Sequence, residues 1–585
     1  MLEVSKNKTA QALCAGLEAP YGTLVLRRLP YLLSMLDRNP YSPTYGCFDR
    51  GFWHYRTMTD YAAPVHQEAA LTFALIYLQQ TPDNPYCGSE ELHQGAVAAM
   101  RFWCGLQRRD GSFDEFYPGE RSFVATAFTS YAISETVRLL GESIDERTRG
   151  EVLETLIRAA QWLDRHRDVA VVNHTAGAIA ALQNLVLLTG DSKFAAWRET
   201  KITDLLARQH EEGWFYEYGG ADLGYLSMSV DYLAKDYRHS RDERLGRALH
   251  KALEFMAHFV HPDGSYGGEY GSRNVKYLMP HGLEIMAEES TAAGYLLQRL
   301  YPVMESGAVV APHLMDDRYT GFFLNKYTEA WAEYRPREVE CEMVEPMPQT
   351  RFFSGAGLLV HKSSRLHAVV GLSKHGVIKV YDAAAKKMIY GDTGYFAVFD
   401  DSTVATTQWL ELGADCEVIE CLGGVEVQLK CQMATVNVEL PMAKYLIPFR
   451  LFLKTLGWWG YLMDRFGDVV KDRMITSRRL LPLYIERRIQ LEENSMQITD
   501  KLQLRGGARL CKLGRTPDAS ALHVASSRYY QPNEQKVEGT WRAETECIEA
   551  LNRGKVVAVA TQVQLDGAQI EYAVDTAVGK EDMAA

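Results

Sequence analysis

The chain has 585 residues, several times the ~150 residues of a usual domain, so a single small module is excluded. Apolar residues make up 47% and charged residues 24% of it, which excludes disordered and collagen-like proteins. With 63 basic and 75 acidic residues the formal net charge is −12, so the basic footprint of sequence-independent nucleic-acid binding is not expected.

The start of the chain and its cysteines bear on cellular location. The first thirty residues lack the continuous apolar core of a secretory signal, and no run of 18 apolar residues follows. The ten cysteines form no CxxC pair and no zinc-finger spacing, which favours reduced thiols over a disulfide framework. We therefore expect a cytoplasmic protein.

Between about residues 60 and 300 the sequence predicts one amphipathic helix after another. Apolar residues recur at i, i+3 and i+4, so each helix would bury one stripe. The predicted helices cover 66–80, 123–140, 151–166, 174–188 and 245–260. Many such helices in series can bury their apolar stripes only against one another. This favours helix pairs that curve into an incomplete (α/α) toroid.

A weak repeat supports this arrangement. Gly111, Gly213 and Gly264 stand in similar loops, 102 and 51 residues apart, which indicates a period near 51 and one helix pair per period. Such loops would surround one concave mouth, where aromatic faces suit sugar rings. The tyrosines expected there, unless they only close loops over helix ends, are Tyr117, Tyr218, Tyr266 and Tyr270.

Near the N-terminus, residues 47–56 mix aromatic side chains with two arginines. His54 and Arg56 of this stretch could grip one end of a saccharide. Alternatively, the stretch covers the side of the toroid.

After about residue 335 the apolar period changes to two. Short alternating or β-branched runs with turn residues between them predict an antiparallel β-sandwich. We therefore predict an α+β multidomain protein, with a toroid over 1–340 and a sandwich over 350–585.

A helical insertion at about 441–481 interrupts the predicted sandwich. Its first part, 441–471, is rich in Leu, Phe and Trp but is broken by Lys444, Arg450 and Lys454. This segment either packs on its own protein as an amphipathic helix or lies on a membrane surface.

Asn173 and His174 open an Ala-rich helix, and Tyr225 follows at the start of another helix about fifty residues later. Asn173 could be the N-cap of its helix. If all three side chains face one cleft, the amide can bond a carboxylate, the imidazole can take a proton, and the phenol can give or take one at a glycosidic oxygen.

The sequence resembles the heparinase II/III-like polysaccharide lyases, a group that includes oligo-alginate lyases. The resemblance rests on Asn173-His174, on Gly224-Tyr225, on helices followed by a β-sandwich, and on the stretch GDTGY at 391–395. It implies β-elimination from a glycan that contains uronic acid, which leaves a 4,5-unsaturated end.

The resemblance also implies roles for these residues. Asn173 would mask the C6 carboxylate, because abstraction of the C5 proton places a second negative charge on that group. His174 would serve as base or donor. Tyr225 would protonate the leaving oxygen or share the role of base.

Members of this group usually carry a further catalytic His, and often a structural metal, in a His-x-His-x-x-Asp-like stretch of the β-domain. The comparable stretch here, 373–381, holds one histidine, His375, and no carboxylate at the expected distance. We expect His375 to take the catalytic position. No cofactor is expected, and a divalent metal in this domain has no support from the ligand spacing.

The Gly-rich stretch at 268–274, with the nearby His281, could bind the acidic substrate. Arg273 could hold a carboxylate in bidentate fashion, while Asn274 and His281 bond hydroxyls. Glu269 and Tyr270 of the same stretch are further candidates, as is Tyr218. Alternatively, Arg273 pairs with Glu269 and the loop is structural.

Two other functions are compatible with the sequence. A glycoside hydrolase on the same ring would need two carboxyl groups, for which Glu217, Asp222 and Glu269 are candidates. A glycan-binding protein of exopolysaccharide metabolism could keep the fold without the chemistry.

Overall fold

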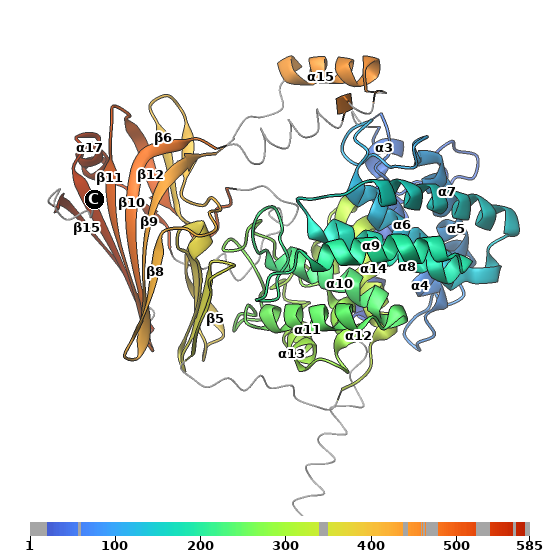
Figure 1. Cartoon of the computed structure of the whole chain (residues 1–585), viewed down its shortest axis with the longest axis horizontal. Coiled ribbons are helices and arrows are strands. Elements are labelled where there is room, and N and C mark those ends of the chain that lie inside the picture. Colours follow the sequence, from blue (N-terminus) through green and yellow to red (C-terminus); the bar gives the residue numbers. More distant parts are fainter. Residues whose placement is uncertain are drawn as a thin grey trace, which may run out of the picture.

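The computed structural model describes residues 20–56, 60–337, 349–436, 443–457, 459, 462–463, 478–521, 537, 539–565 and 569–578. Helices fill the chain as far as Glu333, and strands predominate from Gln349 onward. The two parts stand side by side, with the helical part on the right of Figure 1 and the sheets on the left. The predicted fold class is confirmed.

The helical domain consists of an inner and an outer ring of helices. The inner helices are α4 (Ala69–Leu78), α6 (Phe123–Leu140), α8 (Val172–Thr189), α10 (Leu223–Ser240), α12 (Pro280–Met286) and α14 (Asp317–Glu333). The outer helices are α2 (Gly22–Met35), α5 (Glu90–Leu106), α7 (Glu146–Arg165), α9 (Ser192–Leu206), α11 (Glu243–Ala257) and α13 (Thr291–Leu300), and the short α3 spans Arg50–Trp53.

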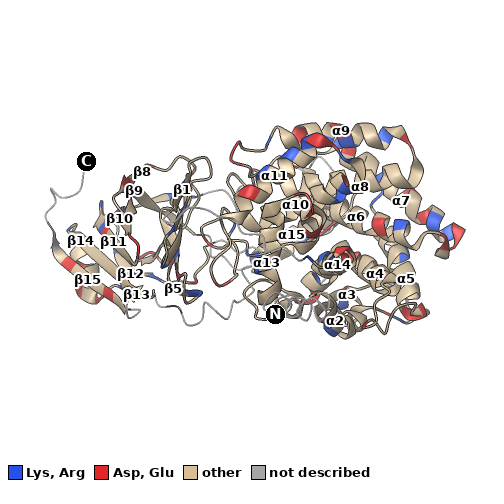
Figure 2. Ribbon diagram, turned by 90° about the horizontal axis from the view of Figure 1, so that it is seen from below, with Lys and Arg blue, Asp and Glu red and all other residues tan. Residues whose placement is uncertain are grey.

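Each inner helix packs on the next, and α14 packs on α4, as a toroid of helix pairs requires. Across the ring, the Tyr131 hydroxyl of α6 donates to Glu329 of α14, and Lys235 of α10 pairs with the same carboxylate. Inner helices are enclosed on all sides and are buried almost throughout, whereas α7 and α11 bury one stripe. Charged residues are accordingly frequent along the outer helices (Figure 2).

The repeated glycines have a shared structural role. Gly111, Gly213 and Gly264 all have positive φ and close equivalent turns, each donating its N–H to the carbonyl three residues earlier. A Cβ on Gly213 would lie 2.2 Å from the Lys251 carbonyl oxygen, and one on Gly111 2.3 Å from that of Arg158. Only glycine allows both the backbone angle and this close approach to the neighbouring helix.

The second domain contains two antiparallel sheets. The inner sheet has the order β1-β2-β3-β4-β5, with β1 Gln349–Phe353, β2 Leu358–Lys362, β3 Leu366–Gly371, β4 Val377–Asp382 and β5 Lys387–Asp392. The outer sheet has the order β13-β12-β6-β7-β9-β10-β11-β14-β15, with β8 on β9. Its strands are β6 Tyr395–Phe399, β7 Val404–Thr406, β8 Cys416–Cys421, β9 Gly424–Thr435, β10 Leu480–Leu491, β11 Ser495–Leu504, β12 Leu510–Arg515, β13 Trp541–Arg542, β14 Val556–Gln564 and β15 Gln569–Val578, and α17 spans Thr545–Asn552.

The inner sheet is buried on both faces because it lies between the outer sheet and the helices (Figure 1). Val370 and Ile378 pack toward the outer sheet, whereas Val369 and Val377 join the core of the helical domain. Alternate residues of one strand therefore serve two different cores. This arrangement fixes the β-domain against the loops at one end of the toroid.

The GDTGY stretch belongs to the interior of the sandwich. Asp392 accepts from Arg487 at 2.8 Å and from Arg515 at 3.1 Å, and Asp500 pairs with the same two arginines. The Tyr395 hydroxyl donates to Asp500 at 2.8 Å. All five side chains are buried, so this motif holds the sandwich together and has no place at a substrate site.

The insertion predicted at 441–481 contains helix α15 (Ala443–Thr455), and the structure describes only part of the rest. Helix α15 leaves the sandwich and docks on the helical domain. The Phe449 ring meets the Tyr117 ring at 5.4 Å, and Arg450 pairs with Asp60 at 2.9 Å. The described residues contain no helix long and apolar enough to cross a membrane.

Candidate active site

Asn173 lies in the first turn of α8, and Glu217 fixes its side chain. The Glu217 carboxyl accepts from the Asn173 backbone N–H at 2.9 Å and from its Nδ2 at 3.0 Å. Asn173 is therefore not the N-cap predicted, since Val171 takes that position and the carboxyl of Glu217 satisfies a free helix N–H. Burial raises the pKa of Glu217 well above its usual value and so favours its neutral form.

His174 is the next residue of α8, and Asp168 orients its ring. Asp168 Oδ2 lies 2.8 Å from His174 Nδ1. The loop that carries Asp168 is held in turn by Arg208, which donates to the Asp168 carbonyl. A carboxylate beside Nδ1 favours the tautomer that carries its proton on Nδ1, and in that tautomer Nε2 can accept a proton from a substrate.

Tyr225 and Tyr218 stand at the start of α10, where Asp222 is the N-cap and accepts from the Tyr225 backbone N–H. The two rings lie 6.4 Å apart. Within the described ranges the Tyr225 hydroxyl has no hydrogen-bond partner. Burial raises the pKa of Tyr225 well above its usual value, so its phenol keeps the proton at neutral pH.

Arg273 brings a cation to the same place. Its guanidinium carbon lies 4.1 Å from the centroid of the Tyr218 ring, and its side chain is 8% exposed. Its Nε has no hydrogen-bond partner, and no carboxylate among the described residues pairs with it. Burial lowers the pKa of Arg273, and the groups that oppose this effect include Tyr218, Tyr225 and Glu217. These residues therefore lie close together.

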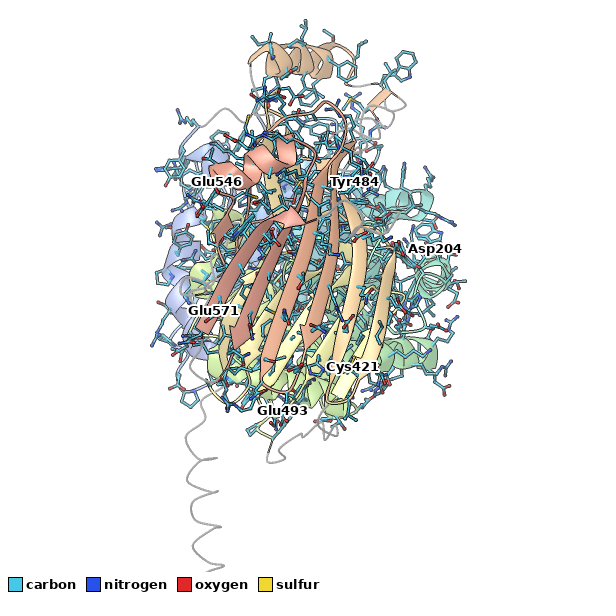
Figure 3. All side chains as sticks on the ribbon, turned by 90° about the vertical axis from the view of Figure 1, so that its left-hand side faces the viewer. Asp204, Cys421, Tyr484, Glu493, Glu546 and Glu571 are labelled. Carbon is cyan, nitrogen blue, oxygen red and sulfur yellow. The ribbon has the colours of Figure 1, made fainter. Side chains whose placement is uncertain are left out.

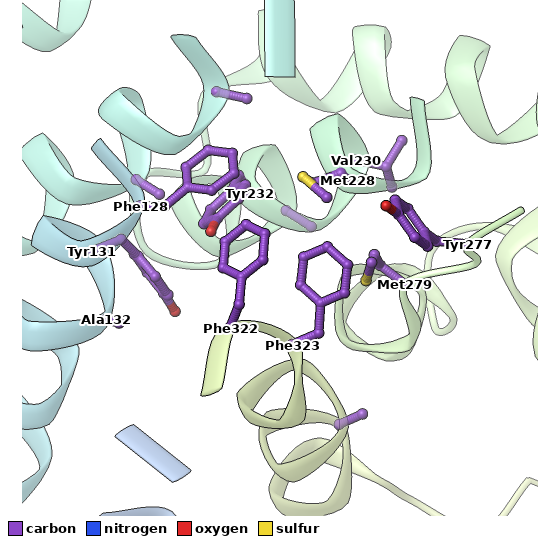
Figure 4. Close-up of a cluster of buried hydrophobic side chains, with 14 of the residues drawn as sticks. Phe128, Tyr131, Ala132, Met228, Val230, Tyr232, Tyr277, Met279, Phe322 and Phe323 are labelled. Atoms are coloured by element: carbon purple, nitrogen blue, oxygen red, sulfur yellow. The ribbon is translucent and has the colours of Figure 1, made fainter. Parts of the chain in front are cut away.

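An aromatic cluster inside the ring forms the base of this site (Figure 4). Phe128 of α6 meets the His174 ring edge-on at 5.9 Å and stacks on Phe322 of α14. Tyr277 meets the Tyr225 ring at 6.4 Å. This packing restricts the imidazole and the phenol and closes the ring interior to water on that side.

Asn274 joins the site to the β-domain. Its Nδ2 donates to Ser520 at 2.6 Å and to Gln408 at 3.4 Å, and its Oδ1 accepts from Lys374 at 3.3 Å. Asn274 was predicted to bond a substrate hydroxyl, but these contacts occupy its side chain. It instead fixes the backbone beside Arg273.

His375 does not reach the site predicted for it. Its Nδ1 meets the Thr407 carbonyl and its Nε2 meets Glu411, each at 2.9 Å, beneath the Trp409 ring. Because His375 has a positive φ, the chain turns there, and Lys374 points toward the helical domain instead. Burial and the nearby Arg273 lower the pKa of the Lys374 ammonium to about 7.

Three predicted binding residues are buried elsewhere. Glu269 pairs with Lys276 at 2.8 Å and with Lys379 of β4 at 3.0 Å, and it does not pair with Arg273. The Tyr270 hydroxyl bonds His261 in the interface between the domains, and His281 lies beside Glu329 in the ring interior. All three are under 4% exposed and are paired in the ring interior or across the interface between the domains, so they support the fold.

The remaining predicted residues lie away from Arg273 and Tyr225, two of them on the surface and two packed against other residues. His54 and Arg56 are exposed after α3, and the His54 ring contacts those of Trp53 and Tyr55. Tyr266 is fully buried with its hydroxyl on the Leu223 carbonyl, and Tyr117 lies beneath α15. Of the four tyrosines expected at the mouth, Tyr218 alone adjoins Arg273 and Tyr225.

The arrangement of acidic groups weighs against a hydrolase. Glu217 is bonded to Asn173, Asp222 accepts backbone N–H groups of Tyr225 and Arg273, and Glu269 is paired with two lysines. All three acids are buried, so none is available as the exposed carboxylate that would activate water. No group of three His, Cys, Asp or Glu side chains in the described part could hold a metal ion, and His375 lacks the further ligands.

Sequence reasoning missed two groups, Asp168 and Lys374. Asp168 stands six residues before His174, across a loop whose path the sequence does not reveal. Lys374 precedes the predicted His375 in the chain. Which of the two side chains faces the site depends on the backbone turn at His375.

Residues 73–282 match the family model described as the ulvan lyase N-terminal domain. This part of the chain is therefore similar to that domain. The match includes Asn173, His174, Tyr225 and Arg273. The resemblance to polysaccharide lyases that the sequence indicated is confirmed by this match.

No curated protein matches the chain. Among solved structures, it is similar to a Paenibacillus xanthan lyase (TM-score 0.49, 10% identity, 85% of this chain and 46% of that one). It is also similar to the chondroitin AC lyase of Streptomyces coelicolor A3 in complex with chondroitin sulphate (TM-score 0.47, 10% identity, 93% and 88%). A third similar structure is the heparan sulfate lyase HepC of Pedobacter heparinus (TM-score 0.37, 11% identity, 77% and 63%). The chain spans less than half the length of the xanthan lyase.

Proposed function

We propose that this lyase-type protein cleaves a glycan containing uronic acid by β-elimination, and that Asn173, His174, Tyr225 and Arg273 carry the reaction. The observation that most supports it is Arg273, a buried cation with no carboxylate partner in the described part of the chain, beside a phenol that keeps its proton. A buried unpaired charge is costly, and a substrate carboxylate would supply the missing partner.

The first step requires the C6 carboxylate to be neutralised. Arg273 and the Asn173 amide would bond its two oxygens, so that charge developing on the carboxylate is stabilised during proton removal. Glu217 sets the orientation of that amide before substrate arrives, because it accepts both N–H groups of Asn173. This prior orientation reduces the reorganisation needed in the transition state.

His174 Nε2 would then take the C5 proton, and the electron pair of the C5–H bond would form the C4=C5 double bond. The C4–O4 bond breaks, and Tyr225 gives its proton to the departing oxygen. The raised pKa of Tyr225 favours this donor role over that of a base. Proton return from His174 to Tyr225 through water restores the site.

The test is an ultraviolet assay for the conjugated double bond at the new sugar end. Purified full-length protein would be given ulvan, alginate, heparan sulfate, hyaluronan and bacterial acidic exopolysaccharides in turn. Absorbance that rises together with new chain ends supports elimination. New reducing ends without that absorbance would indicate hydrolysis, and binding without either would indicate a non-catalytic glycan-binding protein.

A further inference from the structure

Helix α15 presents apolar side chains to solvent on the side that faces away from the protein. The Phe449 ring contacts Tyr117 of the helical domain and Leu453 is buried, yet Ile447 is 67% and Leu451 is 64% exposed. A surface helix of a soluble protein usually has a polar outer face. In Figure 3 the helix stands clear at the top of the molecule, so no described element covers that face.

The exposed side chains follow the helical period. Ile447 and Leu451 are one turn apart, and Lys444 and Lys454 lie on the same side at either end. Tyr445, Leu446 and Leu456 extend the apolar surface around the helix, and Trp459 just beyond it is 51% exposed. We call this set, with the two lysines, the α15 face.

The charge of the segment is opposite to that of the chain. From Ala443 to Leu456 there are three basic residues and no acidic one, although the whole chain carries a net charge of −12. Arg450 is engaged with Asp60, which anchors the helix, so the lysines at the two ends supply the outward charge. Such a face is complementary to an anionic surface.

We infer that the α15 face binds the surface of an anionic lipid membrane, with the helix lying in the plane of the headgroups. Contact with acyl chains stabilises leucine and isoleucine side chains, and lipid phosphates attract lysines. Tryptophan and tyrosine prefer the interfacial layer between headgroups and acyl chains. At 13 residues the helix is about 20 Å long, too short to cross a ~30 Å hydrocarbon core. The inference does not depend on the proposed reaction.

Two other occupants fit the face less well. A glycan would use aromatic faces edged by hydrogen-bonding groups, and aliphatic Ile447 and Leu451 offer neither. A second copy of the chain, packed about a two-fold axis, would bring the lysines of one helix toward those of the other with no acid in the segment to pair them.

The experiment is flotation of the full-length protein with vesicles of phosphatidylcholine alone or of phosphatidylcholine with phosphatidylglycerol. We expect flotation with the anionic vesicles only, and a loss of bound protein by roughly tenfold or more in Ile447→Ser/Leu451→Ser. Lys444→Gln/Lys454→Gln should weaken binding and its dependence on salt. Every changed side chain is exposed, so each variant should fold.

The matched control is Leu422→Ser/Leu187→Ser, which removes two exposed leucines outside α15. Leu422 follows Cys421, at the opposite end of the molecule in Figure 3. The control should float like the original protein. The inference is overturned if the anionic vesicles do not retain the protein, or if the α15 variants float unchanged. It is also overturned if the α15 variants instead abolish a dimer in sedimentation or retention on an acidic glycan.

Discussion

Arg273 stacks on Tyr218, with 4.1 Å between its guanidinium carbon and the ring centroid, and has no anionic partner among the described residues. Tyr218 itself has a positive φ of 53°, which turns its ring toward the arginine. The two residues come from loops 55 positions apart, and the backbone N–H of Arg273 is tied to Asp222 at 2.9 Å. The cation is thus held in place before any substrate binds.

Removal of this cation should abolish most of the proposed activity. We expect Arg273→Ala to lower kcat/KM by about 10²–10³-fold, because the enolate charge loses its strongest donor. Arg273→Lys should recover little, since lysine neither stacks on Tyr218 nor bonds a carboxylate in bidentate fashion. The measurement is initial rate on the glycan that gives unsaturated product. Arg244→Gln, at an exposed ion pair on α11, is the control and should retain full activity.

Asp168 should act on the reaction only through His174. In Asp168→Asn the amide can donate to Nδ1 and so move the imidazole proton to Nε2, which removes the base. We expect kcat to fall by about 10²-fold or more with little change in KM. The thermal midpoint separates this role from a structural one: the variant should unfold at the same temperature as the original protein, whereas a merely destabilised protein would unfold at a lower one.

The buried ammonium of Lys374 should make stability depend on pH. Its pKa falls from 10.5 in the unfolded chain to about 7 in the folded protein. The burial of Lys374 therefore does not lower the free energy of unfolding above pH 10.5, and it lowers that free energy more and more as the pH falls toward 7. Between pH 9 and pH 7 this amounts to about 2 kcal/mol. The free energy of unfolding, measured with denaturant, should therefore be higher for Lys374→Met than for the original protein by an amount that increases as the pH falls from 9 to 7. An equal difference at both pH values would contradict the shift.

The repeated turn predicts a sharp difference between two glycines. Gly213 has a φ of 106° and would place a Cβ 2.2 Å from a carbonyl oxygen, so Gly213→Ala should cost several kcal/mol, on the order of 3. Gly190 has a φ of 67° with open space around it, and Gly190→Ala should cost only about 1 kcal/mol. Similar thermal midpoints for the two variants would show that the turn is not under this constraint.

Periodicity alone located most of the secondary structure. The helix predicted over 123–140 coincides with α6, and the strand runs after residue 355 correspond to β2, β3, β4 and the long strands of the outer sheet. The period of 51 identified turns that share a backbone conformation. Periodicity could not show that α14 packs beside α4, because this packing depends on contacts such as that of Asn325 with Glu68, 257 positions apart.

The site was harder to predict, for an identifiable reason. Side chains at helix starts, such as His174 and Tyr225, could be chosen because a ring of helix pairs places its loops together. For the loop at 268–274 the sequence could not show which polar residues belong to the site. Arg273 faces the site, whereas Glu269 forms ion pairs with two lysines, one of them from the other domain. At 373–381 a single residue with positive φ decided the outcome, and the sequence carries no sign of it.

The most direct test of the central claim is the ultraviolet assay on acidic glycans with the original protein and with Tyr225→Phe. Tyr225→Phe removes one oxygen atom that has no described partner, so the fold should survive while the leaving oxygen loses its proton donor. The account predicts unsaturated chain ends from at least one uronic-acid glycan, and a fall of about 10²-fold or more in that product with Tyr225→Phe. Unsaturated product formed at an unchanged rate by Tyr225→Phe, or cleavage that leaves saturated ends, would contradict it.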